Sequence, residues 1–91
     1  MGKTSLNVLI IEDSEFDAQI LVNLLLVGGY EVNFRRVESA VELETALSDK
    51  EWDVILADYN LPEFQAPEAL VIVKKSEQDL PFIVISGGIG E

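Results

Sequence analysis

Short apolar runs alternate with longer segments of helical periodicity along the chain. Residues 6–11 form an apolar run that is too short for a helix and rich in branched residues, which predicts a buried strand. Similar runs at residues 54–57 and 82–85 predict two more buried strands. Residues 31–35 alternate strictly between polar and apolar, which predicts a strand buried on one side, at an edge of the sheet.

The first of three predicted helices is unusually apolar. Ser14 can cap its start, acidic residues occupy its first turn, and it ends at Val27 before the glycine pair 28–29. Apolar residues surround most of its circumference. We therefore expect protein to cover more than one face of this helix.

The second and third predicted helices are shorter and more clearly two-sided. Ser39 begins the second helix, and its expected inward-facing residues are Ala40, Leu43 and Leu47. A loop broken by Pro62 and Pro67 precedes the third helix, residues 68–75, whose last turn carries lysines. Its apolar residues are Leu70, Val71 and Val73.

Strands and helices therefore alternate from one end of the chain to the other. Such alternation predicts an α/β fold in which parallel strands are joined by right-handed crossovers and helices cover both faces of the sheet. Ligands of such folds bind beyond the carboxyl ends of the strands, where the strand order reverses.

Composition narrows the classes of function. The 91 residues suit one small domain spanning residues 1–91, and 6 basic against 17 acidic residues give a net charge of −11. This acidity argues against nucleic acid and against an anionic membrane surface as partners. The chain has no Cys and no His, which excludes disulfides, thiolate chemistry and the commonest general base. It shows neither a signal peptide nor an apolar stretch of membrane-spanning length, so we expect a cytoplasmic location.

Polar residues directly follow three of the predicted strands. Glu12 and Asp13 follow the first strand, Asp58 the third and Ser86 the fourth. Parallel strands would bring these residues to one edge of the sheet, where clustered carboxylates repel one another unless a cation lies between them. Oxygen ligands of this kind suit Mg²⁺. The alternative is that the acidic residues only solvate strand ends or cap helices. Separately, we expect the basic pair Arg35-Arg36 to be solvated.

These motifs resemble the response regulator receiver domain of two-component signalling. The resemblance is carried by Ile-Ile-Glu-Asp-Ser at residues 10–14, by the Asp-Tyr-Asn-Leu-Pro element that begins at Asp58, and by the apolar strand that ends at Ser86-Gly87. It implies a flavodoxin-like doubly wound parallel sheet with strand order 2-1-3-4. It also implies a fifth strand and last helices that are missing from this chain, which stops at Glu91.

The resemblance also implies a role for each motif residue. Asp58 would accept a phosphoryl group from a histidine kinase or a phosphotransfer protein. Mg²⁺ would be bound by Glu12, Asp13, Asp58 and the backbone carbonyl of Asn60. Ser86 would hydrogen-bond the phosphoryl group and switch the conformation of its loop, and the Asn60 side chain would tune the lifetime of the phosphorylated state. The chain would then be a phosphoacceptor and not a turnover enzyme.

Departures from the family leave alternatives open. The family's Lys on the fifth strand has no counterpart here, which allows a non-phosphorylatable pseudo-receiver or an interaction fragment. The strand at residues 82–85 would be an unpaired edge without a fifth strand beside it. We therefore expect that the chain self-associates through this strand or is a fragment of a longer protein. The Gln65-Ala66 pair resembles receiver domains attached to hybrid kinases. A haloacid-dehalogenase-like phosphatase would carry a second Asp where this chain has Asn60.

Overall fold

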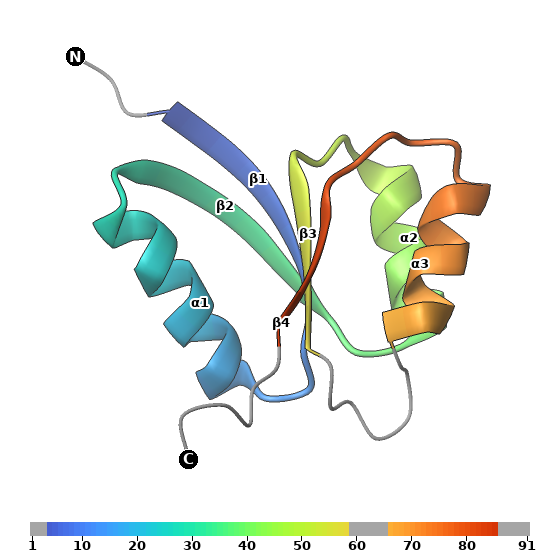
Figure 1. Cartoon of the computed structure of the whole chain (residues 1–91), viewed down its shortest axis with the longest axis horizontal. Coiled ribbons are helices and arrows are strands. Elements are labelled where there is room, and N and C mark those ends of the chain that lie inside the picture. The colour runs from blue at the N-terminus through green and yellow to red at the C-terminus, as the bar shows by residue number, and fades with distance from the viewer. Residues whose placement is uncertain (1–3, 59–65, 86–91) are drawn as a thin grey trace.

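Four parallel strands form one sheet in the computed structural model, which describes residues 4–58 and 66–85 (Figure 1). The strand order is β2-β1-β3-β4, so the predicted α/β fold and the order 2-1-3-4 are confirmed. The strands are β1 (Thr4–Ile11), β2 (Tyr30–Val37), β3 (Val54–Asp58) and β4 (Phe82–Ile85). The helices are α1 (Glu15–Val27), α2 (Ala40–Asp49) and α3 (Ala66–Lys75).

Strand β1 lies at the centre of the sheet because both of its faces are apolar. It pairs with β2 along its whole length and with β3 through residues 8–11. Val8, Leu9, Ile10 and Ile11 are completely buried. Successive side chains of a strand point to opposite faces, so this run supplies both layers of the core.

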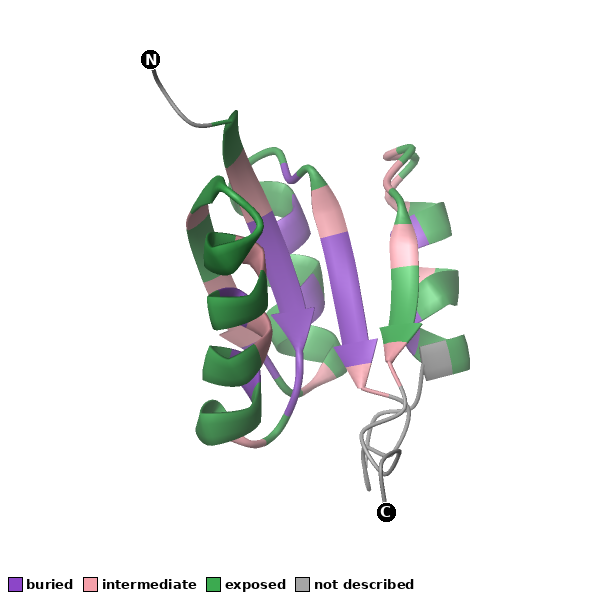
Figure 2. Cartoon of the chain, turned by 60° about the vertical axis from the view of Figure 1, so that its left-hand side comes forward, coloured by how far each residue is buried: buried purple, intermediate pink, exposed green. Residues whose placement is uncertain are grey.

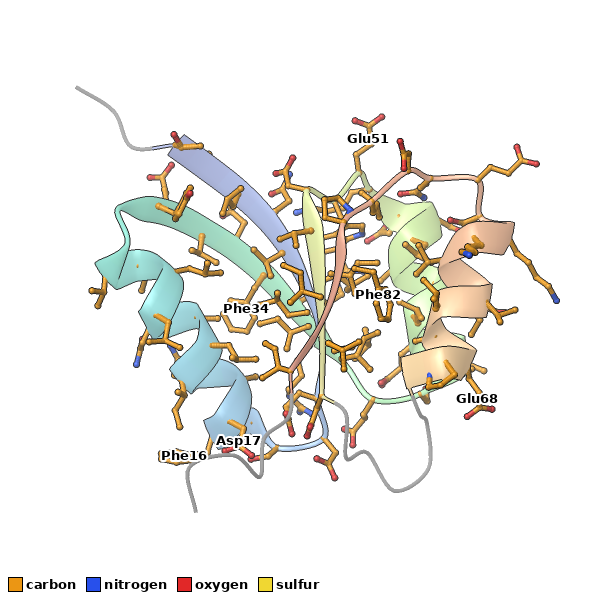
Figure 3. All side chains as sticks on the ribbon, viewed as in Figure 1. Phe16, Asp17, Phe34, Glu51, Glu68 and Phe82 are labelled. Atoms are coloured by element: carbon orange, nitrogen blue, oxygen red, sulfur yellow. The ribbon has the colours of Figure 1, made fainter. Side chains whose placement is uncertain are left out.

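Helix α1 covers one face of the sheet, and α2 and α3 cover the other (Figure 1). Phe34 lies on the α1 side and Phe82 on the side of α2 and α3 (Figure 3). The buried residues on the α1 side are Val8, Ile10, Ala18, Val22 and Leu56. Those on the other side are Leu9, Ile11, Val37, Leu43, Ala46, Leu47, Trp52, Ile55, Ala57, Ala69 and Val73.

Serine residues begin the first two helices, as their positions predict. The Ser14 hydroxyl accepts a hydrogen bond from the Asp17 amide at 3.2 Å, and the Ser39 hydroxyl accepts one from the Glu42 amide at 3.2 Å. Helix α1 ends before Gly29, whose φ of +99° is readily adopted only by glycine.

Within residues 4–58 and 66–85, protein covers only one face of α1, so this part of the chain does not supply the second cover that the sequence predicts. Ala18 and Val22 are buried against the sheet, whereas most of the helix surface is open to solvent (Figure 2). The reason is geometric, because α1 is the one described helix on its side of the sheet and only one of its faces can meet the strands.

Two smaller expectations also need correction. Ala40, the first residue of α2, is exposed, and Ala46 takes the inward position beside Leu43 and Leu47. Helix α3 begins at Ala66, so Pro67 stands in its first turn, where the missing amide hydrogen has no helical partner to lose. In α3, Val73 packs inward with Ala69, and the other two apolar residues named from the sequence, Leu70 and Val71, are exposed.

The described helices are also short. None is long and apolar enough to cross a membrane within residues 4–58 and 66–85.

Candidate functional site

The carboxyl ends of β1 and β3 bring three acidic side chains together. Glu12 and Asp13 follow β1, and Asp58 is the last residue of β3. The parallel pairing of Ile11 with Ala57 aligns these two ends. One carboxylate oxygen from each of the three residues lies within 4.8 Å of the others. The predicted convergence of these acids at one edge of the sheet is therefore observed.

Glu12 is the buried member of this acidic cluster, with 4% of its surface exposed. Its amide donates a hydrogen bond to the carbonyl of Val37 at 3.0 Å, which fixes the backbone beside the end of β2. Its carboxylate accepts a hydrogen bond from the Ser14 amide at 3.0 Å. Asp13 is exposed and Asp58 half-buried. The cluster thus combines one fixed, desolvated carboxyl group with two that water can reach.

Burial raises the pKa of Glu12 from 4.5 to about 7. The hydrogen bond from the Ser14 amide acts in the opposite direction, because it favours the charged form. Hydrogen bonding with Asp58 and Asp13, and the negative charge of Asp58, raise the pKa further. Glu12 is therefore poised to hold or release a proton near neutral pH.

The acidic cluster fits a hard divalent cation such as Mg²⁺. Ligand oxygens about 2.1 Å from an octahedral ion lie about 3 to 4 Å apart. The three carboxylate oxygens already lie within 4.8 Å of one another, so small side-chain shifts would bring them to that spacing. A cation there would also offset the repulsion among the acids.

Arg36 fixes the backbone of the site, contrary to the expectation that the basic pair is solvated. Its Nη1 atom donates to the carbonyl of Glu12 at 3.2 Å and lies 3.5 Å from that of Asp13. The same atom forms an ion pair with Glu38 at 3.2 Å. The sequence carried no local signal for this contact, because it depends on the pairing of Ile10 with Arg36 across β1 and β2.

A hollow of about 210 Å³ opens beside the acidic cluster. Its lining residues come from α1, from β4 and from the cluster itself, and they are Glu12, Asp17, Ile20, Leu21, Asp58 and Ile85. Asp17 lies at the end of α1 that faces the site (Figure 3). It adds a fourth carboxylate that the sequence motifs did not single out.

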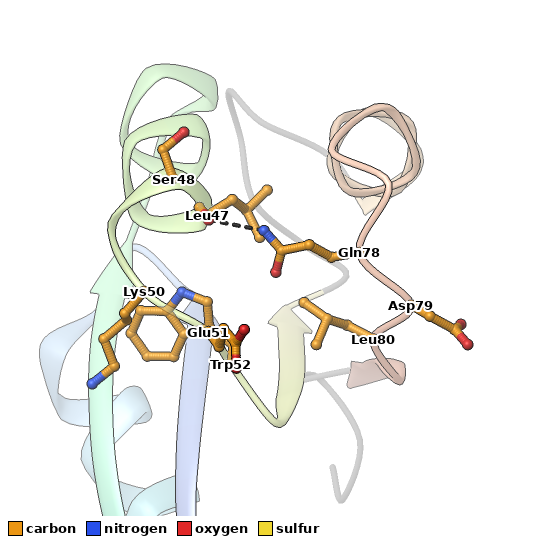
Figure 4. A pocket seen from close by; sticks show the side chains of 8 residues that line it. All are labelled: Leu47, Ser48, Lys50, Glu51, Trp52, Gln78, Asp79 and Leu80. Atoms are coloured by element: carbon orange, nitrogen blue, oxygen red, sulfur yellow. Dashed lines mark hydrogen bonds between the residues drawn. The ribbon is translucent and has the colours of Figure 1, made fainter.

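A wider hollow of about 460 Å³ lies at the opposite edge of the sheet (Figure 4). Its lining includes Trp52 and Leu80, which precede β3 and β4, and Gln78, whose side chain donates to the carbonyl of Leu47 at 2.8 Å. Trp52 is buried, as expected of a packing residue. The acids that line this hollow, Glu51 and Asp79, do not belong to the group of acids close enough to share a metal ion.

Two predicted site residues, Asn60 and Ser86, lie outside the described residues. Their expected roles stay predictions.

Comparisons with known proteins identify a matching family and solved structures of similar fold. The family described as "Response regulator receiver domain" matches residues 8–90. The chain resembles a fusion protein that carries a yeast Spc42 trimeric coiled coil, with a TM-score of 0.76 and 25% identity over 94% of this chain and 56% of the other. Full-length FixJ from B. japonicum has the same fold, with a TM-score of 0.71 and 21% identity over 89% of this chain and 39% of FixJ.

A curated protein also matches part of the sequence. The probable E3 ubiquitin-protein ligase dma1 of Schizosaccharomyces pombe is 41% identical over 54 residues, which are 59% of this chain. The match spans only 18% of the length of that relative.

Proposed function

The chain belongs to the response regulator receiver domain family, and from this membership we propose that it is a phosphoacceptor module with Asp58 as its phosphoacceptor. Receiver domains are signalling modules of two-component systems. The observation that carries the finer proposal is the cluster formed by Glu12, Asp13 and Asp58. It supplies a half-exposed nucleophile beside two further carboxylates that suit a metal ion.

The proposed reaction transfers a phosphoryl group from a phosphohistidine to Asp58. A carboxylate oxygen of Asp58 forms a bond to phosphorus while the nitrogen–phosphorus bond of the donor breaks. The electron pair of that bond stays on the imidazole nitrogen, and the product is an aspartyl phosphate. The 91 residues contain no His, so the phosphohistidine would lie outside them, in a histidine kinase or a phosphotransfer protein. The module would not be a turnover enzyme, and such a donor is consistent with a cytoplasmic location.

Glu12, Asp13, Asp58 and the backbone carbonyl of Asn60 would hold Mg²⁺ in this proposal. When bound, the ion would offset negative charge on the phosphoryl oxygens during transfer. The proton on Glu12 competes with a cation at the same carboxyl group, because burial raises the pKa of Glu12 to about 7. Ser86 would hydrogen-bond the transferred phosphoryl group, and Asn60 would influence the lifetime of the product.

Acetyl phosphate with Mg²⁺ tests the proposal directly. We expect the intact mass to increase by one phosphoryl group, and we expect hydroxylamine to remove it, as it does from acyl phosphates. Asp58→Asn should abolish the modification. The matched control is Asp79→Asn, which removes an exposed carboxylate at the opposite edge of the sheet.

Three results would overturn the proposal. An unmodified wild-type chain would favour a pseudo-receiver that acts only through binding. Modification that survives Asp58→Asn would assign the phosphoryl group to another residue. Steady release of inorganic phosphate from a phosphomonoester would instead indicate a phosphatase.

A further inference from the structure

The outward face of α1 is an apolar surface that nothing covers in the described chain. Phe16, Leu24 and Val27 are 75%, 63% and 87% exposed, and Ile20 is also exposed. We call these four residues the α1 stripe. Figure 2 shows this side of the helix as exposed along its whole length.

Helix geometry places the α1 stripe opposite the buried face of the helix. At about 100° per residue, Phe16, Ile20 and Val27 point within about 40° of one another, and Leu24 lies next to them. Ala18 and Val22 project from the other side into the core. The stripe is therefore a second apolar face, and a helix with apolar residues on both sides is normally covered on both.

Beyond its first turn, where Glu15 and Asp17 flank Phe16, the α1 stripe is free of charge, in contrast to the chain as a whole. No Asp, Glu, Lys or Arg occurs in residues 18–30, although the chain carries a net charge of −11. Neutral amides flank the stripe, where the Gln19 side chain donates to that of Asn23 at 3.1 Å. A partner for this surface needs an apolar face without charges.

We propose that the α1 stripe is an interface between two copies of this chain. The stripe exposes roughly 500 Å² per copy, within the range of the largest apolar patch on a typical monomer, and such a patch is often functional. Two copies would bury roughly 1,000 Å², close to the lower limit for a specific interface and typical of a weak dimer. A second copy provides the uncharged apolar face that the stripe requires. This inference does not depend on phosphoryl transfer.

Two-fold symmetry sets the geometry of the pair. Each copy would present the same surface, with the two α1 helices packed against each other. Phe16, Ile20 and Leu24 follow one another at intervals of four residues, and two such ridges interlock at a crossing angle of about −50°. In the antiparallel arrangement of such a pair, the Phe16 end of one helix lies near the Val27 end of the other.

Salt distinguishes a second copy from a basic partner. Two chains that each carry −11 repel one another, and added salt screens that repulsion. The dimer should therefore become tighter as NaCl is raised, whereas a complex with a basic protein would weaken.

Sedimentation equilibrium of the whole chain tests the interface. We expect the mass to rise with concentration from 10.1 kDa towards twice that value. Leu24→Glu should weaken the association at least tenfold. Val41→Glu is the matched control, because it places the same charge on an exposed apolar residue of α2, and it should leave the association unchanged. Val84→Lys tests the competing route through the exposed residues of β4.

A cross-linking experiment gives an independent test that does not rely on losing the dimer. The chain has no cysteine, so a single introduced thiol can pair only with a second copy. Asn23→Cys should oxidise to a disulfide-linked dimer much faster than Ser48→Cys, which lies on α2.

Several outcomes would overturn the proposal. A wild-type chain that stays monomeric at all concentrations, with equal cross-linking rates for the two thiols, would show that no second copy covers the stripe. Association that survives Leu24→Glu but is lost in Val84→Lys would assign the interface to β4. Equal loss in Leu24→Glu and Val41→Glu would point to general repulsion and not to the stripe.

Discussion

Replacing Glu12 with Gln should make the domain more stable at neutral and alkaline pH. Burial raises the pKa of Glu12 to about 7 from 4.5, and a shift of one pKa unit corresponds to about 1.4 kcal/mol. Ionised Glu12 therefore lowers the free energy of unfolding by about 3 kcal/mol at high pH. Gln has nearly the same shape, and its amide oxygen can still accept the hydrogen bond from the Ser14 amide.

The direction of this pH effect follows from the number of protons that Glu12 binds in the folded and unfolded states. Between pH 4.5 and about 7, Glu12 keeps its proton in the folded state and has released it in the unfolded state. Stability contributed by Glu12 is thus fully present below pH 4.5 and is lost as the pH rises through 7. About 2 kcal/mol of the loss falls between pH 5.5 and 8. This window avoids the isoelectric point near 4.1, where the chain is prone to precipitate.

Urea unfolding followed by the fluorescence of Trp52 measures the effect, since Trp52 is buried and is the only tryptophan in the chain. Wild type and Glu12→Gln should differ by about 2 kcal/mol more at pH 8 than at pH 5.5. Glu44→Gln is the matched control, because it removes the same charge from an exposed position on α2. The free energy of unfolding of this variant should change with pH as it does in wild type. A difference between wild type and Glu12→Gln that does not change with pH would refute the reasoning.

Mg²⁺ extends the same experiment. If the ion binds the acidic cluster, it should stabilise the wild type more at pH 8 than at pH 5.5, because Glu12 must lose its proton to become a ligand. The gain should shrink in Glu12→Gln and remain in Glu44→Gln. If Mg²⁺ stabilises the wild type equally at both pH values, binding of the ion does not require Glu12 to be ionised.

Two further predictions concern the fold. Ile55→Ala, in the completely buried centre of β3, should lower the free energy of unfolding in urea by about 2–5 kcal/mol, whereas Val41→Ala at an exposed position should change it by less than about 0.5 kcal/mol. Ser39→Ala removes the hydroxyl that accepts from the Glu42 amide, and it should reduce thermal stability by about 1 kcal/mol, while Ser48→Ala at an exposed position leaves it unchanged.

Much of the fold could be predicted because each strand has a local pattern that matches its place in the sheet. The unbroken apolar run in β1 corresponds to burial on both faces, and the alternation within β2 corresponds to an edge strand. The acidic cluster followed from the same reasoning. Once the strands are parallel, Asp13 and Asp58 must reach the same edge.

Other features depend on contacts between segments and carry no local signal. The bond from Arg36 to the Glu12 carbonyl requires the exact register of β1 and β2. Ala40 is exposed although it lies one turn before Leu43, and the buried residues of α2 are Leu43, Ala46 and Leu47. The apolar composition of α1 showed that the helix needs covering, but composition alone cannot name the surface that covers it.

The burial of Glu12 favours one of the two interpretations of the acidic cluster, a cation site over acids that only solvate strand ends. Acids that only solvate the end of a strand would stay in water, yet Glu12 is 4% exposed. A capping role is real, because its carboxylate accepts from the Ser14 amide, the residue that begins α1. One such bond does not offset the loss of water, since the pKa of Glu12 remains near 7. Burying Glu12 beside two other carboxyl groups destabilises the folded domain when Glu12 is ionised. A cation bound to the three groups would restore that stability, which links the stability of the domain to its proposed chemistry.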